Sequence, residues 1–439
     1  MLKYLRKKIG YDNPIRLLWH RLKAVIAAVC YGFPGKSMVI IGVTGTNGKT
    51  TTTHMIEHIL RTNGKRVAMI STSDFSIDGK KHPNLSKKTT MSPFKTQAFL
   101  KKCVMQKMDY VVIESSSHAL HQSRLWGIPF AISVITNITH EHLDYHGTME
   151  KYAEAKKILF KMVSANCRRP KSKVLATIPH QNAFVLNTAD QYYERFHKIH
   201  CPLKIEYGFD EGSLRAKDAV YSKEGAKFAL SYAGETLGVK LSLAGAYNIE
   251  NAMAATGASL ACKLKLDDIV RALSSFEGVG GRMERIKSPR GFEVIVDFAL
   301  TPDALDKLYS VLRETAEGRI IGIIGSCGDR DREKRPVMGK IVAGYSDITI
   351  VTDEEPYSED PDTIMKAVLE GAKKAAKLDK NLFLIKDRYK AIEYAIKEAK
   401  KDDLVVVTGM GSFTTRTLNK GPIPWDEREV VRELINKNC

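Results

Sequence analysis

The sequence predicts an α/β protein made of two doubly wound, parallel-sheet domains, and two alternating series of strands and helices are the main evidence. Short apolar strand candidates alternate with helical stretches from Met38 onward, and a second series of the same kind begins near Glu293. Strands separated by helices of this length form βαβ units, in which the strands run parallel. The glycine-rich segment 277–281 lies between the two series and predicts a hinge there.

The expected elements follow from runs of β-branched and aromatic residues, with longer helical stretches between them. In the first series the expected strands are Met38–Val43, Val67–Ile70, Tyr110–Ile113, Ala131–Ile135 and Phe184–Leu186, and the expected helices include Thr51–Leu60, Pro93–Met105 and Met149–Phe160. In the second series the expected strands are Val294–Phe298, Ile320–Ile324, Ile348–Val351, Leu382–Ile385 and Leu404–Val407. Residues 218–243 instead alternate as in a β-hairpin that turns at Ala233 and Gly234.

An amphipathic helix is expected over residues 14–30, ahead of the first strand. Arg16, Arg21 and Lys23 lie off its apolar stripe, which consists of Ile15, Leu18, Trp19, Leu22, Val25, Ile26 and Val29. Two interpretations fit: the stripe docks on the following domain, or the helix lies on a membrane surface. We expect docking on the domain, because most such stripes face protein.

Composition bounds the class of protein. The chain has 439 residues, of which 44% are hydrophobic and 27% charged, so it can bury a large core and is neither collagen-like nor disordered. Lys and Arg number 68 against 50 Asp and Glu, and the net charge of +18 favours acidic partners. The 7 cysteines are scattered, which argues against a disulfide framework or zinc site and indicates the cytoplasm. No apolar run can cross a bilayer, so we expect no stable membrane insertion.

A glycine-rich turn directly follows the first expected strand and opens the first helix. It consists of Gly45, Thr46, Asn47, Gly48, Lys49, Thr50 and Thr51. The backbone N–H groups of such a turn close around phosphate oxygens, and the helix N-terminus adds its positive dipole. Lys49 can reach the terminal phosphates, and the Thr50 hydroxyl can bind Mg²⁺. The full Walker spacing needs Gly where Val43 stands, so this is a shortened variant, but its strand–loop–helix context predicts phosphate binding rather than a chance turn.

Two further segments place candidate ligands after expected strands. Glu114 stands at the carboxyl end of its strand, where ligands of parallel sheets bind, and could hold a cation that bridges phosphates. An exposed strand-end glutamate is the alternative. The segment 140–146 contains three His together with Glu141 and Asp144. A metal cluster and a polar loop both fit, and the pattern does not say which His serves.

Four segments, taken together, resemble the Mur ligase family: GTNGKTTT (45–52), ESSSHAL (114–120), NITHEHLDYHG (137–147) and YAEAKKILF (152–160). The resemblance continues through LAGAYNIEN (243–251), GRME (281–284), Asp297, TPDAL (301–305) and GDRDREKRP (328–336), and so extends from Val39 to the last residue. The chain is most similar to the branch that adds the third amino acid of the peptidoglycan stem peptide. The domains expected from it are a basic helical arm (1–37), a central ATP-binding P-loop domain (38–277) and a Rossmann-like C-terminal domain (278–439).

The resemblance implies a cytoplasmic, monomeric ATP-dependent ligase that forms an amide bond. ATP phosphorylates a substrate carboxylate to an acyl phosphate, and an amino acid then displaces the phosphate. Two Mg²⁺ ions are implied, one held by Thr50 and Glu114 and a second with His142 as a ligand. Lys49, Glu114, His142 and Lys156 are the implied catalytic residues. Lys156 is expected to react with CO₂ to give a carbamate, which requires a lowered pKa.

The same resemblance assigns further contacts. Asn248 and Asn251 resemble an adenine-contacting pair, and Arg282, Asp297, Arg330 and Lys334 resemble residues that close over ribose and phosphates. A solvated charge run is the alternative for Arg330 and its neighbours. The candidates for substrate contact are Thr89, Thr90, Ser116, His118, Glu355 and Tyr357. The implied partners are an acidic nucleotide-sugar peptide and an amino acid.

The sequence departs from the family pattern at substrate-binding positions. Only a short segment precedes the P-loop strand, so the usual N-terminal domain for the uridine nucleotide is missing from the pattern. The family's Asp-Asn-Pro-Arg motif is replaced here by Glu354-Glu355-Pro356-Tyr357. The family's Gly-Lys-Gly-His-Glu motif is replaced by Gly-Met-Gly-Ser-Phe at Gly409–Phe413, and its Ala-His-Thr-Pro motif by Ala-Leu-Thr-Pro at Ala299–Pro302. Without the Arg, a second carboxylate on the amino acid loses its bidentate partner, so we expect lysine or ornithine.

Three alternatives stay open at this point. The first is a ligase of the same superfamily that acts on another acid, such as a folylpolyglutamate, storage or pseudomurein peptide. The second is a non-catalytic nucleotide-binding scaffold, which would have no need of Lys49, Glu114, His142 and Lys156 together. The third is a nucleic-acid-binding protein, motivated by the charge of +18, but no basic strand face with interleaved aromatic residues supports it, and we expect no nucleic acid.

Overall fold

The structure is a computed structural model that describes residues 13–168 and 173–438, so the first part of the expected arm lies outside it. The chain divides into two compact units, which are described one at a time. Unit 1 comprises residues 1–220, 227–241 and 246–276, and unit 2 comprises residues 221–226, 242–245 and 277–439. Within the described residues, no helix is long and apolar enough to span a membrane.

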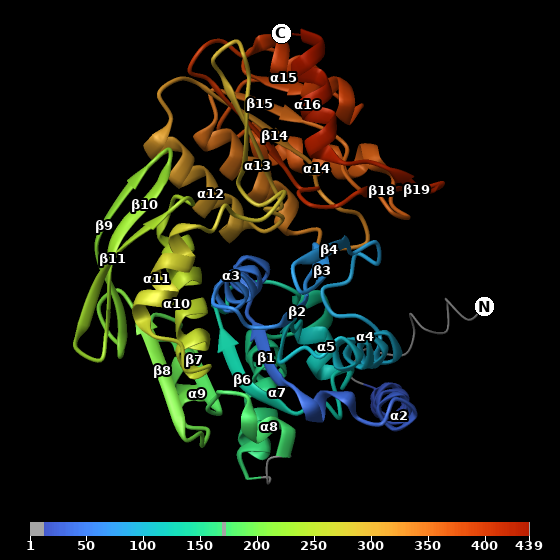
Figure 1. Ribbon diagram of the computed structural model, residues 1–439. Helices are drawn as coiled ribbons and strands as arrows, with labels where there is room; N and C mark the ends of the chain where they lie inside the picture. The colour runs from blue at the N-terminus through green and yellow to red at the C-terminus, as the bar shows by residue number, and fades with distance from the viewer. Residues whose placement is uncertain (1–12, 169–172, 439) are drawn as a thin grey trace. The chain divides into compact units, whose positions relative to one another are not determined.

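Unit 1 is built on a sheet of 11 strands in the order β11-β10-β9-β8-β7-β6-β1-β5-β2-β3-β4 (Figure 1). Its strands are β1 (Val39–Thr44), β2 (Val67–Ile70), β3 (Asp74–Ile77), β4 (Lys80–Pro83), β5 (Tyr110–Glu114), β6 (Phe130–Ile135), β7 (Ala183–Asn187), β8 (Leu203–Gly208), β9 (Leu214–Ser222), β10 (Gly225–Tyr232) and β11 (Glu235–Leu241). The strands around β1 are parallel, whereas β2–β3 and β3–β4 pair antiparallel.

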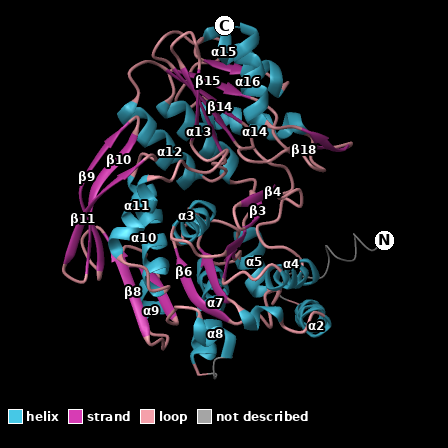
Figure 2. Cartoon of the chain, in the orientation of Figure 1, coloured by secondary structure: helices cyan, strands magenta, loops and turns pink. Residues whose placement is uncertain are grey.

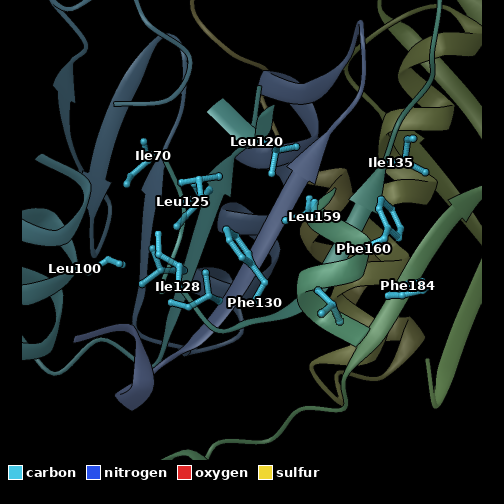
Figure 3. Close-up of a cluster of buried hydrophobic side chains, with 14 of the residues drawn as sticks. Ile70, Leu100, Leu120, Leu125, Ile128, Phe130, Ile135, Leu159, Phe160 and Phe184 are labelled. Carbon is cyan, nitrogen blue, oxygen red and sulfur yellow. The ribbon is translucent and has the colours of Figure 1, made fainter. Parts of the chain in front are cut away.

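The centre of the sheet is covered on both faces. Every residue of β1, β5 and β6 is buried, as expected for a parallel sheet between layers of helices. Figure 3 shows one of the resulting clusters, in which Leu159 and Phe160 lie near Phe130 and Phe184. β1 lies between β5 and β6, which follow it in the chain, so the strand order reverses there. In parallel sheets, ligands bind at the carboxyl ends of the strands beside such a reversal.

The helices of unit 1 connect these strands (Figure 2). They are α2 (Pro14–Cys30), the short 3₁₀ helix η1 (Pro34–Ser37), α3 (Lys49–Thr62), α4 (Pro93–Met105), α5 (Ser117–His121), α6 (Leu143–His146), α7 (Met149–Cys167), α8 (Lys173–Thr177), α9 (Tyr193–His197), α10 (Ala246–Ala261) and α11 (Leu266–Ser274). α3 packs against α10, and α7 packs against α5 and β6.

The helix expected over residues 14–30 is present as α2, but it docks with a different face. Ala24, Ala27 and Ala28 are buried, while the predicted stripe, represented by Leu18 and Trp19, is exposed. The expectation that the stripe docks on the domain was therefore wrong. Small alanine side chains let the helix backbone approach the domain closely, which a row of large side chains would prevent.

Unit 2 is built on a sheet of 6 strands in the order β12-β13-β17-β14-β15-β16, with a separate two-stranded hairpin β18–β19. The strands are β12 (Glu284–Lys287), β13 (Glu293–Asp297), β14 (Ile320–Ile324), β15 (Ile348–Val351), β16 (Leu382–Leu384), β17 (Leu404–Thr408), β18 (Thr415–Leu418) and β19 (Gly421–Pro424). Five of them, β13 to β17, are parallel. The helices are α12 (Pro302–Thr315), α13 (Lys334–Tyr345), α14 (Pro361–Ala372), α15 (Arg388–Glu398) and α16 (Glu427–Asn438). This is the predicted Rossmann-like arrangement.

Candidate functional site

The glycine-rich turn after β1 is held in shape by residues that follow β6. The backbone N–H of Thr46 donates to the carbonyl of Asn137 (2.7 Å), and the N–H of Asn47 donates to the Asn137 side chain (3.0 Å). The Thr136 hydroxyl donates to the carbonyl of Asn47 (2.6 Å). Thr136 and Asn137 were not among the predicted site residues, although their place at the carboxyl end of a strand next to β1 was a usable signal.

Gly48 and Asn251 show why this turn requires glycine and why α10 belongs to the site. Gly48 has φ +83°, and a Cβ there would come within 2.1 Å of the Asn251 side-chain oxygen. That oxygen accepts from the Thr52 hydroxyl (3.3 Å), and the Asn251 amide donates to Asn248 (3.3 Å). Asn251 therefore lies against the turn itself, and Asn248 lies beside Asn251.

Glu114 forms the acidic centre of unit 1. β1 and β5 pair in parallel with Val43 opposite Glu114, so the buried carboxylate lies beside the start of the turn. The Thr50 hydroxyl lies 3.2 and 3.1 Å from its two oxygens. Thr72, which follows β2, donates hydrogen bonds from its N–H (2.7 Å) and its hydroxyl (2.9 Å) to the same carboxylate. Thr72 was not among the site residues predicted from the sequence. These hard oxygen groups suit a magnesium ion that also binds phosphates.

Lys49 and Lys156 converge on the turn from two helices. Lys49, the first residue of α3, donates to the carbonyl of Thr46 (2.6 Å), and Lys156 of α7 donates to the carbonyl of Gly45 (2.6 Å). Lys156 is buried, and its Nζ lies 4.2 Å from the ring centroid of Tyr152. Burial, together with the repulsion of the Lys49 charge, lowers the pKa of Lys156 well below its usual value.

A group of aromatic and imidazole rings connects the predicted His residues to the turn. The rings of His118 and His142 lie 4.6 Å apart between centroids, and His142 lies 6.2 Å from Tyr152. The Tyr152 hydroxyl is 3.1 Å from the Thr46 hydroxyl. His146, which was not singled out, is buried and bonds to Ser117 (3.0 Å). Of the three His in the cluster 140–146, the structure therefore brings His142 and His146 to this group.

The predicted substrate residues of unit 1 adjoin Glu114. The Thr90 hydroxyl donates to the Glu114 carbonyl (2.9 Å) and accepts the N–H of Ser116 (3.0 Å). The Thr89 hydroxyl lies 3.0 Å from that of Thr72. These hydroxyls form a polar rim beside the carboxylate.

Unit 2 gathers a second set of predicted residues at the carboxyl end of β13. Asp297 accepts the N–H of Met283 (2.6 Å), and burial raises its pKa despite the nearby charge of Arg282. The Arg282 guanidinium lies 4.2 Å from the ring centroid of Phe298, and Arg282 also lines a cavity of about 410 Å³. Lys334 begins α13 and donates to the carbonyl of Leu300 (2.8 Å).

Three consecutive acids follow β15 in unit 2, and Glu354 and Glu355 are the last two of them. Glu355 is buried, accepts the N–H of Thr417 (2.6 Å) and accepts the hydroxyl of Tyr357 (3.1 Å). Burial raises the pKa of Glu354 to about 7. The Glu354 carboxyl group accepts a hydrogen bond from the Cys327 thiol (3.0 Å). Arg330 lies 5.7 Å from the Tyr357 ring centroid. Glu355, Tyr357 and Arg330 are thus close together.

Within the described ranges, no group of three or more His, Cys, Asp and Glu side chains is arranged to hold a metal ion. Mg²⁺ usually binds through one or two carboxylates, waters and substrate phosphates, so it does not need such a group. Glu114 and Thr50 fit magnesium, because the buried Glu114 carboxylate lies within hydrogen-bond distance of the Thr50 hydroxyl.

The fold and these groups define a class of protein. A glycine-rich turn at a helix N-terminus, beside a buried carboxylate in a parallel sheet and followed in the chain by a Rossmann-like domain, is typical of a nucleotide-dependent enzyme. Residues 43–259 match the family "Mur ligase middle domain", and residues 281–411 match "Mur ligase, glutamate ligase domain". The chain belongs to the Mur ligase family, a family of ATP-dependent ligases, as the resemblance implied.

Relatives and solved structures agree with this assignment. The chain is 35% identical over 432 residues to "UDP-N-acetylmuramoyl-L-alanyl-D-glutamate--2,6-diaminopimelate ligase" of Bacillus cereus, covering 98% of the chain and 85% of the relative. It is 36% identical to "UDP-N-acetylmuramyl-tripeptide synthetase" of Roseiflexus sp., covering 94% and 81%. A solved diaminopimelate ligase matches with 30% identity and a TM-score of 0.62, covering 91% of the chain and 78% of that structure. The folylpolyglutamate synthase of Mycobacterium tuberculosis (TM-score 0.69, 17% identity, covering 89% and 93%) shares the fold.

Proposed function

We propose that this chain is an ATP-dependent ligase that activates a substrate carboxylate as an acyl phosphate and couples it to an amino acid, adding the third residue to a UDP-N-acetylmuramoyl-dipeptide. The Bacillus cereus relative carries a UDP-N-acetylmuramoyl-dipeptide in its name, and the Roseiflexus relative is named for the tripeptide. The observation that carries the proposal is the Thr50–Glu114–Thr72 group beside Lys49, because it places oxygen ligands and a cation where the strands end.

The chemistry requires the chain to bring anions together. A carboxylate oxygen of the acceptor attacks the γ-phosphorus of ATP, and the bond to ADP breaks. The amine then attacks the acyl carbon, loses a proton and expels inorganic phosphate. Lys49 stabilises the phosphoryl charge during the first step. Thr50 and Glu114 would hold one Mg²⁺ and His142 would be a ligand of a second, and these ions would neutralise charge between the two anions.

We further propose that Lys156 carries a carbamate. Its burial and lowered pKa favour the neutral amine, which is the form that attacks CO₂. The carbamate would convert a cation into an anion beside the turn, and so add a ligand for magnesium. Mass spectrometry with trapping of the carbamate under CO₂ tests this assignment. A Lys156→Ala variant with full activity and no added carboxylate would contradict it.

We also propose that the incoming amino acid is a diamino acid with one carboxylate, such as lysine or ornithine. Glu354 and Glu355 present acidic groups where the family motif has Asp and Asn, and Tyr357 stands where it has Arg. A terminal ammonium group is favoured by such an environment, whereas a second carboxylate would be repelled. Arg330 is a nearby cation, with its guanidinium over the Tyr357 ring.

A matrix of phosphate release tests both the activity and the substrates. The full chain is incubated with Mg²⁺ and ATP, with UDP-muramyl-dipeptide or a folate as acceptor, and with lysine, ornithine, meso-diaminopimelate or glutamate as amine. We expect release that requires both UDP-muramyl-dipeptide and lysine or ornithine. Release with the folate and glutamate alone would assign the chain to a different acid. No release with any pair would contradict a ligase, and Lys49→Ala provides the inactive control.

A further inference from the structure

α2 presents a continuous apolar face to solvent. Six large side chains project from it, and their exposed fractions are 78% for Ile15, 66% for Leu18, 53% for Trp19, 45% for Leu22, 42% for Ile26 and 60% for Val29. At about 3.6 residues per turn, these positions form one stripe along the whole helix. Six of the fifteen large exposed hydrophobic side chains in the described part of the chain therefore lie on this helix. Clustering of this kind indicates a surface that binds something.

The opposite face fixes the helix in place. Ala24, Ala27 and Ala28 are buried, and a Cβ added at Gly127 would come within 2.9 Å of the Ala28 Cβ. Gly127 has φ +82°, so it suits glycine for both its conformation and its contact. α2 also packs against α4, which lies beside it in Figure 1. The stripe therefore cannot turn inward without losing this packing.

Both ends of α2 are also ordered by hydrogen bonds. The Asn13 side chain accepts the N–H groups of Ile15 (3.0 Å) and Arg16 (3.4 Å), which is an N-cap. At the other end, the N–H of Tyr31 donates to Ala27 and that of Phe33 donates to Ala28. A helix capped at both ends and anchored along one side holds its outward face in a defined direction.

The charges beside the stripe are all positive. Arg16 and Lys23 lie on one side of it and Arg21 on the other, and the segment Pro14–Cys30 contains neither Asp nor Glu. The Lys23 Nζ lies 4.7 Å from the ring centroid of Trp19, so the cation covers the aromatic face at the edge of the stripe. Two copies of this helix placed face to face would bring like charges together, which disfavours self-association.

We propose that α2 is an interfacial helix that docks the protein on an anionic lipid surface. The apolar stripe would enter the boundary between headgroups and acyl chains, while Arg16, Arg21 and Lys23 contact lipid phosphates. Trp19 is the residue type that favours this boundary. Charge complementarity selects this occupant, since the charged side chains that α2 itself carries are all cations and match a negatively charged surface. The proposal does not depend on the substrate or activity of the ligase.

The test is co-sedimentation of the full chain with vesicles of phosphatidylcholine alone and of phosphatidylcholine containing about one third phosphatidylglycerol. We expect binding to the anionic vesicles that falls as salt is raised, and little binding to the neutral ones. Leu22→Ala should weaken binding about tenfold through loss of buried apolar area. The matched control is Leu378→Ala, because Leu378 is 44% exposed in unit 2 and Leu22 is 45% exposed. That control should bind as the parent does.

Two further measurements separate this role from others. Arg21→Glu combined with Lys23→Glu should weaken binding far more than Lys374→Glu with Lys380→Glu, which makes the same change in net charge on an exposed surface of unit 2. Quenching of Trp fluorescence by brominated lipid should disappear in Trp19→Phe. No binding to either vesicle, equal binding to both, or binding unaffected by Leu22→Ala would overturn the proposal. A dimer in lipid-free sedimentation that Leu22→Ala dissociates would assign the face to a second copy and would also overturn it.

Discussion

Lys156 in unit 1 and Arg388 in unit 2 are both buried cations, but their surroundings differ. Lys156 donates to the carbonyl oxygen of Gly45, whereas Arg388 makes two hydrogen bonds to the carboxylate of buried Glu427 (2.7 and 3.0 Å). Burial lowers the pKa of Lys156 well below its usual value. Burial also acts to lower the pKa of Arg388, but the hydrogen bonds and charge of Glu427, together with the charges of Glu354 and Asp353, raise it above its usual value. A buried basic group with a carboxylate partner stays charged, and one that bonds only to a carbonyl shifts toward its neutral form.

The difference separates Arg388, whose charge stabilises the fold, from Lys156, whose amine is available for chemistry. Arg388 also donates to the carbonyl of Thr408 (2.7 Å) at the end of β17, so it ties two elements of unit 2 together. Lys156 lies against the glycine-rich turn, and its lowered pKa favours the neutral amine. We therefore expect substitution of Arg388 to affect stability and substitution of Lys156 to affect activity.

The largest expected effect is the loss of stability caused by the substitution Arg388→Met. The substitution leaves the Glu427 carboxylate buried without its cation, and we expect the free energy of unfolding to fall by about 3–5 kcal/mol. Denaturant unfolding of the full chain measures this. Arg432→Met is the control, because Arg432 pairs with Glu429 at the surface of the same unit and should change stability by less than about 1 kcal/mol. Equal effects of the two variants would contradict the structural role of the buried pair.

Lys156→Met should give the opposite pattern. We expect phosphate release to fall at least a hundredfold, about 3 kcal/mol in barrier height, while the free energy of unfolding stays equal or rises because a buried amine is removed. If the carbamate proposal holds, a short carboxylate such as acetate should restore part of the activity. Lys157→Met, at the neighbouring half-buried position, should remain active. A Lys156→Met protein that loses as much stability as Arg388→Met would remove the distinction between the two cations.

The raised pKa of Glu354 leads to a prediction of how the stability of unit 2 depends on pH. Its folded pKa of about 7 lies above the ordinary value of 4.5, so between those two values the folded state binds more protons than the unfolded state. Stability should therefore fall as pH rises from 5 to 7.5, on the order of 2 kcal/mol, and level off above it. Glu354→Gln should flatten this part of the profile measured by thermal unfolding. An identical profile in the variant would show that Glu354 does not titrate in this range.

The smallest expected effect is on substrate choice. Glu355→Gln removes one negative charge next to Tyr357. We expect the preference for lysine over meso-diaminopimelate, measured as the ratio of kcat/KM, to fall about tenfold, or about 1.4 kcal/mol. Asp362→Asn, which removes a surface charge of the same unit, should leave the ratio unchanged. An unchanged ratio in Glu355→Gln would contradict the proposed amine site.

The sequence predicted the parallel strands well because their apolar runs are continuous and are bounded by glycine and polar residues. β2 and β14 were predicted with the bounds that the structure shows. The pair β3–β4 was missed, since β4 is a short exposed strand without an apolar face. Periodicity also located the apolar stripe of α2, but it could not show that the alanines on the other side would form the contact.

Residues of the candidate site were predicted where a single short segment has a recognisable pattern. They were not predicted where the site is formed by segments distant in the sequence. The turn from Gly45 to Thr51 was identified from local spacing. Thr72 and Asn137 were not, because their role depends on which strands lie beside β1. Local patterns show what a loop can bind, and the strand order decides which side chains support it.

The contact between Gly48 and Asn251 has a consequence for synthesis of the chain. The glycine-rich turn emerges early from the ribosome, whereas the asparagine that packs on it follows some two hundred residues later. Until α10 has been made and has packed on α3, the turn lacks one of its walls. A nascent chain therefore completes the packing around this turn only after most of unit 1 has been synthesised, which is in the second half of translation.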